Sequence, residues 1–72
     1  MRIKQLIDTS ELWLTFEADD GEGPLVVEIS RKRAMEISRD LASDPDGVAL
    51  VEKHASQVQI VKENGVRYSR IP

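Results

Sequence analysis

The sequence predicts a single small α+β domain over residues 1–72, with a mostly antiparallel sheet of four or five strands and one or two helices on one face. Apolar and polar residues alternate along Glu11–Ala18, which is the period of a half-buried strand. A second apolar run, Leu25–Ile29, leads into Ser30, a good helix cap, and then into an amphipathic stretch. An Asn-Gly pair at 64–65 separates the last two apolar runs, as in β-hairpins. The expected element order is therefore βββ-α-(α)-ββ.

The first part of the chain is expected to form three strands. Arg2–Ile7 has a short and imperfect strand pattern, whereas Glu11–Ala18 has the clearest one, with four inward residues: Leu12, Leu14, Phe16 and Ala18. A loop of glycines, acids and a proline at 19–24 joins this strand to Leu25–Ile29. Because both strands bury one face, folding them back predicts three facing pairs: Phe16 with Val27, Leu14 with Ile29, and Ala18 with Leu25.

A helix is expected to follow Ser30 and to end near Asp44, because a residue that precedes proline disfavours the α conformation. On a helical wheel the apolar arc contains Ala34, Met35, Ile37, Ser38, Leu41 and Ala42. We expect this arc to lie on the sheet against Leu14, Phe16 and Val27.

The segment 46–56 allows two interpretations. Asp44 and Pro45 favour a short second helix, because they suit its cap and its first position. The β-branched residues of Val48–Val51 allow a strand instead. The sequence favours the helix without excluding the strand.

The end of the chain is expected to return to the sheet as a hairpin. Val58–Lys62 and Val66–Ile71 flank the Asn-Gly pair, which is a strong signal for a tight two-residue turn. A turn of this kind places Val61 opposite Tyr68.

Composition narrows the function classes. The chain has a formal net charge of −3, no cysteine and one histidine, which excludes disulfides and thiolate metal sites. The acidic loop lacks the alternating ligands of a calcium loop, so we expect no metal and no cofactor. His54 has no nucleophile or acid facing it, so we expect no enzyme. No apolar run resembles a signal peptide or reaches the roughly 20 residues of a membrane span, which favours a cytoplasmic protein without a membrane partner.

A chain of 72 residues buries a small core and often depends on self-association or a partner. Trp13 is out of phase with the inward residues of its strand, so we expect it on the sheet face away from the helix. An apolar patch is expected there, made of Trp13, Val26, Val61 and Tyr68. The acids best placed to steer a basic partner are Glu11, Glu17, Asp19, Asp20 and Glu22.

These features favour a non-enzymatic protein-interaction module, either an inhibitor or a homodimer. In size, acidity and lack of cysteine the chain resembles the small proteins that phages and mobile elements encode to block host machinery, including anti-CRISPR proteins. This resemblance implies an inhibitor whose partner is a basic or nucleic-acid-binding protein. The alternative is a small nucleic-acid-binding protein that uses Arg31, Lys32, Arg33, Arg67 and Arg70. The net negative charge makes nucleic acid the weaker alternative.

Overall fold

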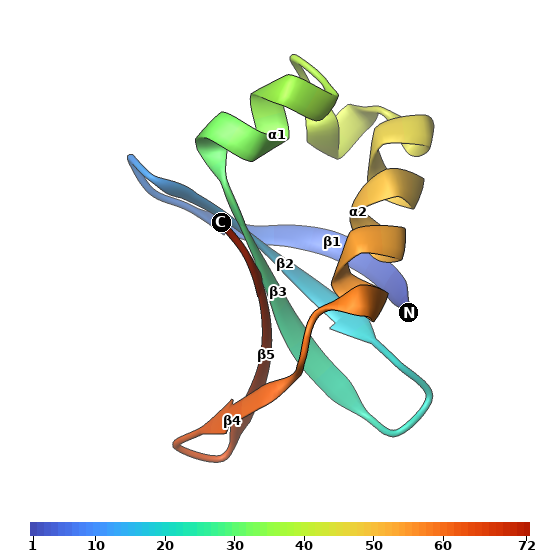
Figure 1. Cartoon of the computed structure of the whole chain (residues 1–72), viewed down its shortest axis with the longest axis vertical. Helices are drawn as coiled ribbons and strands as arrows, with labels where there is room; N and C mark the ends of the chain where they lie inside the picture. Colours follow the sequence, from blue (N-terminus) through green and yellow to red (C-terminus); the bar gives the residue numbers. More distant parts are fainter.

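In the computed structural model, which describes residues 1–72, five strands form one mixed sheet in the order β1-β2-β3-β5-β4, with two helices against one of its faces (Figure 1). The strands are β1 (Arg2–Thr9), β2 (Trp13–Asp19), β3 (Pro24–Ser30), β4 (Val61–Glu63) and β5 (Val66–Ile71). The helices are α1 (Arg31–Ile37) and α2 (Pro45–Gln57), and a short 3₁₀ turn, η1 (Leu41–Ser43), lies between them. This arrangement confirms the predicted α+β class and the predicted element order.

Strands β2 and β3 form the predicted antiparallel hairpin in the predicted register. All three expected pairs are present: Phe16 with Val27, Leu14 with Ile29, and Ala18 with Leu25. A slip of one residue would turn every buried side chain of this hairpin to solvent, so burial of one face fixes the register. The loop between the strands turns with Gly21 and Gly23 at φ of 90° and 141°, a backbone region that favours glycine.

Strand β1 is longer and less regular than the predicted Arg2–Ile7. It extends to Thr9 and shifts register against β2 twice, between Ile3 and Gln5 and between Leu6 and Asp8. Each shift inserts one extra residue, as in a β-bulge. Ile3 and Leu6 therefore pair with buried β2 residues although they lie three positions apart. The two bulges explain why this segment shows an imperfect strand pattern in the sequence.

The prediction that β2 begins at Glu11 with Leu12 facing inward is wrong. Leu12 lies in the β1–β2 turn and is 70% exposed. The Ser10 hydroxyl accepts hydrogen bonds from the backbone N–H groups of Leu12 and Trp13, and the Ser10 N–H donates to the Trp13 carbonyl at 2.9 Å. Serine side chains that bond nearby amides stabilise turns at the expense of strand pairing, so β2 starts only at Trp13.

The prediction of one helix from Ser30 to Asp44 is also wrong at its C-terminal end. Ser30 caps α1 as expected, since its hydroxyl accepts a hydrogen bond from the Arg33 N–H at 3.1 Å. The helix ends at Ile37, because Ser38 has an extended backbone with φ −161° and ψ 145°. Short polar side chains compete for backbone hydrogen bonds in this serine- and aspartate-rich segment, which disfavours a continued helix.

The early helix end changes which residues face the sheet. Ala34 and Leu41 are buried, as the apolar arc predicted, and Ile37 packs against the core from a half-buried position. Met35 was expected to face inward but is 71% exposed, and Ala42 is exposed as well. A helical wheel drawn through both residues assumes a continuous helix, and the break at Ser38 removes that assumption.

Segment 46–56 is helical, so the helix interpretation is confirmed and the strand interpretation is wrong. The Asp44 side chain accepts hydrogen bonds from the backbone N–H groups of Asp46 and Gly47, at 3.1 and 3.2 Å, and Pro45 opens the helix. Val51, near the middle of the same helix, is fully buried. The Ser38 hydroxyl and these backbone N–H groups lower the pKa of Asp44, which keeps the cap charged.

The last hairpin has its predicted turn and a shorter first strand than expected. β5 spans Val66–Ile71 as predicted, but β4 covers only Val61–Glu63 instead of Val58–Lys62. Asn64 and Gly65 form the turn at φ of 52° and 79°. The pair of positive φ angles belongs to a tight turn that matches the twist of a hairpin.

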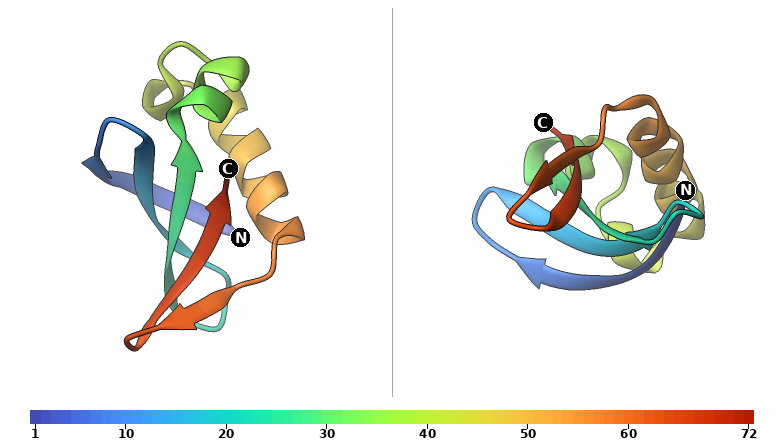
Figure 2. Two further views of the ribbon diagram at one scale, coloured as in Figure 1. Left: turned by 60° about the vertical axis from the view of Figure 1, so that its left-hand side comes forward. Right: turned by 90° about the horizontal axis from the view of Figure 1, so that it is seen from below.

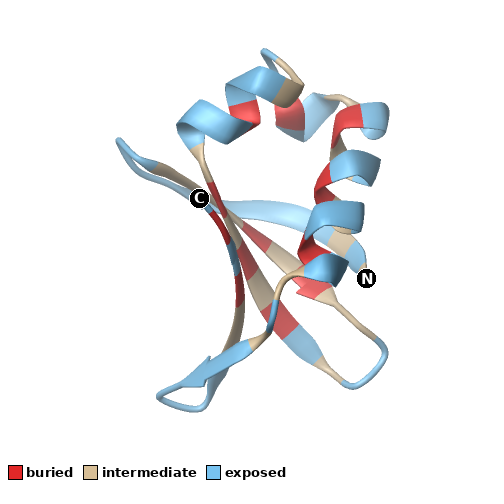
Figure 3. Cartoon of the chain, in the orientation of Figure 1, coloured by how far each residue is buried: buried red, intermediate tan, exposed pale blue.

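The core lies between the sheet and the helices, where Figure 3 shows the buried segments of both facing one another. β5 pairs in parallel with β3, and every other strand pair is antiparallel. Figure 2 shows α2 beside β5. The buried apolar residues are Phe16, Ala18, Leu25, Val27, Ile29, Ala34, Leu41, Val51, Ala55 and Ile71. The buried Ser69 hydroxyl donates to the Ala55 carbonyl at 3.2 Å, which ties β5 to α2.

Candidate interaction surface on the open face of the sheet

Both helices pack on the same side of the sheet, and we call the uncovered side the open face (Figure 1). Side chains alternate along each strand, so residues between the buried ones point to this face. Its members on β2 to β5 are Trp13, Thr15, Glu17, Asp19, Pro24, Val26, Glu28, Val61, Glu63, Val66, Tyr68 and Arg70. None of these side chains is fully buried, which leaves the face accessible to a partner.

Three of the four predicted patch residues lie side by side across the open face. Val26 on β3 pairs with Tyr68 on β5, and Tyr68 pairs with Val61 on β4. On the other side Val26 pairs with Glu17 of β2. We call Val26, Tyr68 and Val61 the apolar row, and it has a carboxylate at one end.

Trp13 does not join the apolar row. The paired residues Glu28 and Arg70 cross the face between them. The Arg70 guanidinium carbon lies 5.4 Å from the centre of the Trp13 ring, and Arg70 Nη2 lies 3.0 Å from Glu28 Oε1. The Glu28 carboxylate raises the pKa of Arg70 above its usual value. The four residues therefore do not form one continuous apolar patch.

Trp13 borders a second hollow, at the end of the sheet near α1. The hollow has a volume of about 410 Å³, and Leu12, Arg31 and Lys32 also line it. Because Leu12 is 70% exposed, the β1–β2 turn presents an apolar tip next to basic side chains.

The largest hollow of the molecule lies at the opposite end of the open face, and we call it the groove. Its volume is about 510 Å³, and residues from all five strands line it. Ile7, Val26 and Val66 form apolar walls, and Glu17 and Lys62 bring one charge of each sign. Ile7 is 50% exposed and Val66 38% exposed, so both offer apolar surface to a ligand in the groove.

The predicted acidic residues have unequal freedom. Asp20 pairs with Arg67 through two hydrogen bonds, and this guanidinium lowers the pKa of the Asp20 carboxyl. Asp19 accepts a hydrogen bond from the Gly21 N–H at 2.7 Å. Asp20 and Asp19 therefore shape the β2–β3 loop.

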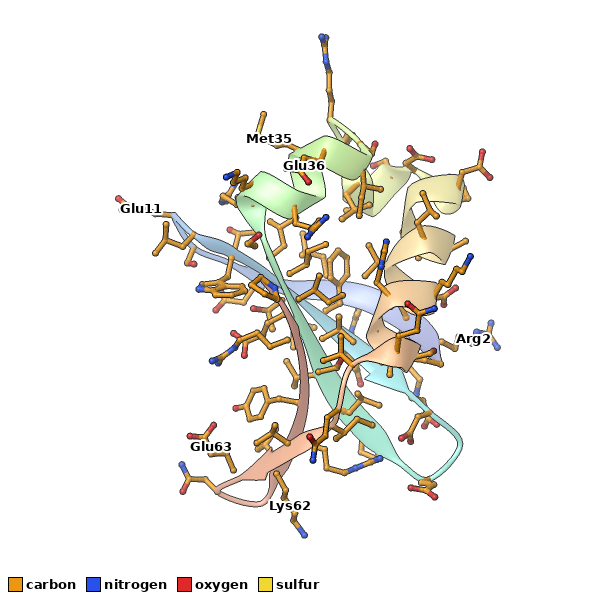
Figure 4. The ribbon with its side chains drawn as sticks, in the orientation of Figure 1. Arg2, Glu11, Met35, Glu36, Lys62 and Glu63 are labelled. Atoms are coloured by element: carbon orange, nitrogen blue, oxygen red, sulfur yellow. The ribbon has the colours of Figure 1, made fainter.

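Three acids remain more available. The Glu22 side chain is 84% exposed, 3.7 Å from Arg67 Nη2 at the edge of the groove. Glu17 lines the groove and accepts a hydrogen bond from Gln5 Nε2 at 2.9 Å. Glu11 is exposed at the tip of the β1–β2 turn, far from the β4–β5 hairpin along the longest axis of the molecule (Figure 4). The structure thus brings Glu17 and Glu22 together at the groove and leaves Glu11 apart.

The predicted basic residues do not form one cluster. Arg67 is bound to Asp20 near the groove, and Arg70 is bound to Glu28 on the open face. Arg31 and Arg33 lie on α1, where Arg31 Nε donates to the Ser10 carbonyl and Arg33 Nη1 lies 3.5 Å from Glu36. Four of the five candidate contacts for nucleic acid therefore already bind acceptors within the chain, and Lys32 is the exception.

No group of three or more His, Cys, Asp or Glu residues has the geometry to hold a metal ion. His54 is exposed in the last turn of α2, and every buried side-chain nitrogen or oxygen has a hydrogen-bond partner. Neither helix has the length and apolar character needed to cross a membrane.

Sequence reasoning missed the groove because it missed two of its walls. Val66 could have been predicted from the sequence, since it lies two residues before Tyr68 on the same strand and shares its face. Ile7 could not, because the bulge between Leu6 and Asp8 shifts the alternation of β1 and no local signal marks a bulge.

Comparisons with known proteins add no functional information. No protein-family model, no curated protein and no solved structure matches this chain. A proposal about function therefore depends on the surfaces described above.

Proposed function

We propose that this protein is a non-enzymatic binding module that uses its open face to bind a basic protein. The observation that supports the proposal is the apolar row next to the groove on an uncovered sheet face with an excess of acids. Five acidic residues lie on this face or line the groove: Glu17, Asp19, Glu22, Glu28 and Glu63. Lys62, Arg67 and Arg70 oppose them, and carboxylates already pair with both arginines.

The two kinds of side chain have different tasks in such a complex. Aromatic and apolar side chains at the centre of an interface supply most of the binding energy, and Tyr68 is the aromatic residue of the apolar row. Charges around them accelerate association and reject partners of the same sign. Glu17 and Glu22, which lie at the groove, are suited to that second task.

A nucleic-acid-binding protein fits this chemistry best among basic partners, because its phosphate-binding surface is basic. An acidic module that covers such a surface blocks it for nucleic acid. The module then acts as an inhibitor by steric exclusion, which agrees with the small size of the chain. The alternative function, direct binding of nucleic acid, has less support because four of the five basic side chains proposed to contact it have partners within the chain.

The test is a titration of the protein with three probes, monitored by NMR and calorimetry. The probes are a peptide of alternating Arg and Leu, the same peptide with Glu in place of Arg, and duplex DNA. We expect the basic peptide alone to bind, with shifts on β3 and β5. Tyr68→Ala is expected to weaken this binding about tenfold, the loss of about 1.4 kcal/mol typical of an interface anchor.

Two charge reversals form a matched pair for the same titration. Glu17→Lys changes an acid of the groove, whereas Glu36→Lys changes an exposed acid on α1, away from the open face (Figure 4). We expect the first to weaken peptide binding and the second to leave it unchanged. Equal effects of both, or binding of DNA in preference to the basic peptide, would overturn the proposal.

A further inference from the structure

The turn between β4 and β5 contains the only asparagine of the chain. Asn64 is followed by Gly65, and both are exposed. Apart from the adjoining residues of the chain, no heavy atom lies within 4 Å of the position that a Cβ on Gly65 would occupy. Glycine has no side chain to hinder its backbone nitrogen, and Gly65 is exposed in the turn.

We infer that Asn64 is a site of spontaneous modification, at which the side-chain amide converts to a carboxylate. The Gly65 backbone nitrogen loses its proton and attacks the Asn64 side-chain carbonyl carbon. The side-chain nitrogen leaves as ammonia, and a five-membered succinimide ring remains. Water then opens this ring at either carbonyl, which gives an ordinary aspartate or an isoaspartate with the backbone running through the former side chain.

The hairpin around this turn is weakly held, which permits the reaction. β4 has only three residues, Val61–Glu63, and all are exposed. Elements with few buried contacts open locally at little cost in free energy. The closed turn restrains the backbone at Asn64 and Gly65, whose φ angles are 52° and 79°. Opening of the hairpin removes this restraint, and we expect ring closure to occur from the opened hairpin.

The two products differ in their effect on the sheet. Aspartate keeps the backbone and tolerates the left-handed conformation that the turn requires. Isoaspartate lengthens the backbone by one carbon inside a two-residue turn, and the register of Val61 with Tyr68 depends on that turn. Because Gly65, Lys62 and Val66 line the groove, the isoaspartate form loses the hairpin wall of the groove.

The experiment is incubation of the full chain at mildly alkaline pH, with intact mass and enzymatic detection of isoaspartate measured over time. We expect a gain of one mass unit per chain, isoaspartate at residue 64, and no gain in Asn64→Asp. The rate is expected to rise with pH because the attacking nitrogen must lose its proton. An unchanged mass, under conditions in which the peptide 61–67 is converted, would overturn the inference.

Two variants separate local opening from global unfolding. Tyr68→Thr removes the ring that faces Val61 and loosens the hairpin, whereas Val51→Ala destabilises the whole domain through a buried position on α2. If the hairpin opens locally, the first variant accelerates the conversion several-fold and the second leaves it nearly unchanged. Equal acceleration in both would show that the reaction requires unfolding of the whole domain, and this result would overturn the inference that the folded protein is modified at Asn64.

Discussion

The two faces of this sheet are built from the same strands and differ in almost every physical property. On β2 and β3 the helix side carries Phe16, Ala18, Leu25, Val27 and Ile29, each at most 2% exposed. The intervening residues on the open face include Thr15, Glu17, Val26 and Glu28, all half-buried. One face is dry and apolar, and the other mixes apolar side chains with ion pairs.

This difference indicates that stability and recognition are separated by the alternation of the strands. Burial of apolar side chains supplies most of the free energy of folding, so the helix side determines whether the domain folds. The ion pairs of the open face contribute little to stability because water screens them. The open face is therefore free to change its chemistry for a partner, provided that the residues between stay apolar.

The sharpest test of this separation uses two adjacent residues of β2. Phe16→Ala removes a side chain that is 2% exposed and should cost about 3–5 kcal/mol, most of the stability of a domain this small. Thr15→Ala, on the open face, should change stability by only about 0.5 kcal/mol. Urea unfolding followed by circular dichroism measures both. Similar losses for the two variants would show that the faces are not separate.

A second test asks whether the helix side has room to spare. A Cβ added at Gly47 would stand 2.9 Å from Leu41 Cδ1 and 3.3 Å from Asp44 Cγ, both closer than ordinary contacts. Alanine is a better helix former than glycine by about 1 kcal/mol, yet we expect Gly47→Ala to destabilise the domain by about 1–3 kcal/mol through overpacking. Thermal unfolding measures the change. A stabilised variant would mean that η1 and α2 repack easily.

The parts of the fold that the sequence predicted are those in which a local pattern and burial agree. In the β2–β3 hairpin the alternation continues without interruption from Trp13 to Asp19 and from Pro24 to Ser30, so one register satisfies both strands. The caps Ser30 and Asp44 also have a local cause, since each side chain accepts hydrogen bonds from backbone groups two or three residues later. Local rules of this kind can be read from one sequence.

The failures occur where the deciding contact is distant or the pattern is interrupted. The register shifts of β1 against β2 depend on the neighbouring strand, and they place Ile7 at the groove. The helix break at Ser38 defeats a wheel that assigned Met35 to the core. Arg70 was noticed only as a basic residue, because its pairing with Glu28 joins positions 42 residues apart. The sequence therefore predicted many of the residues of the candidate surface, but not how they are arranged on it.

A third test concerns the ion pair that supports the groove. The Arg67 guanidinium lowers the pKa of Asp20, so the folded state favours the charged carboxylate. This contribution to stability is complete above the ordinary aspartate pKa of about 3.9 and is lost as the pH falls through the lower pKa of the folded state. We expect the acid unfolding of Asp20→Asn to be less steep below about pH 4 than that of the wild type.

Glu11→Gln is the control for that titration, since Glu11 is an exposed carboxylate at the tip of the β1–β2 turn. Its acid unfolding should follow the wild type. The Asp44 cap remains in both variants and has a lowered pKa of its own, so some sensitivity to acid persists in each. Identical curves for the wild type and Asp20→Asn would show that the pair with Arg67 adds no pH-dependent stability.

The smallest effect on stability is expected for the ion pair of Arg70 with Glu28 on the open face. Its effect on the exposure of Trp13 can be measured by fluorescence. Trp13 is the only tryptophan of the chain, and the Arg70 guanidinium covers one side of its ring at 5.4 Å. Arg70→Ala removes this cover without changing any buried side chain. We expect easier quenching of Trp13 by acrylamide, whereas Arg39→Ala, an exposed change between α1 and η1, leaves quenching unaltered. Unchanged quenching in Arg70→Ala would mean that the strands alone shield Trp13.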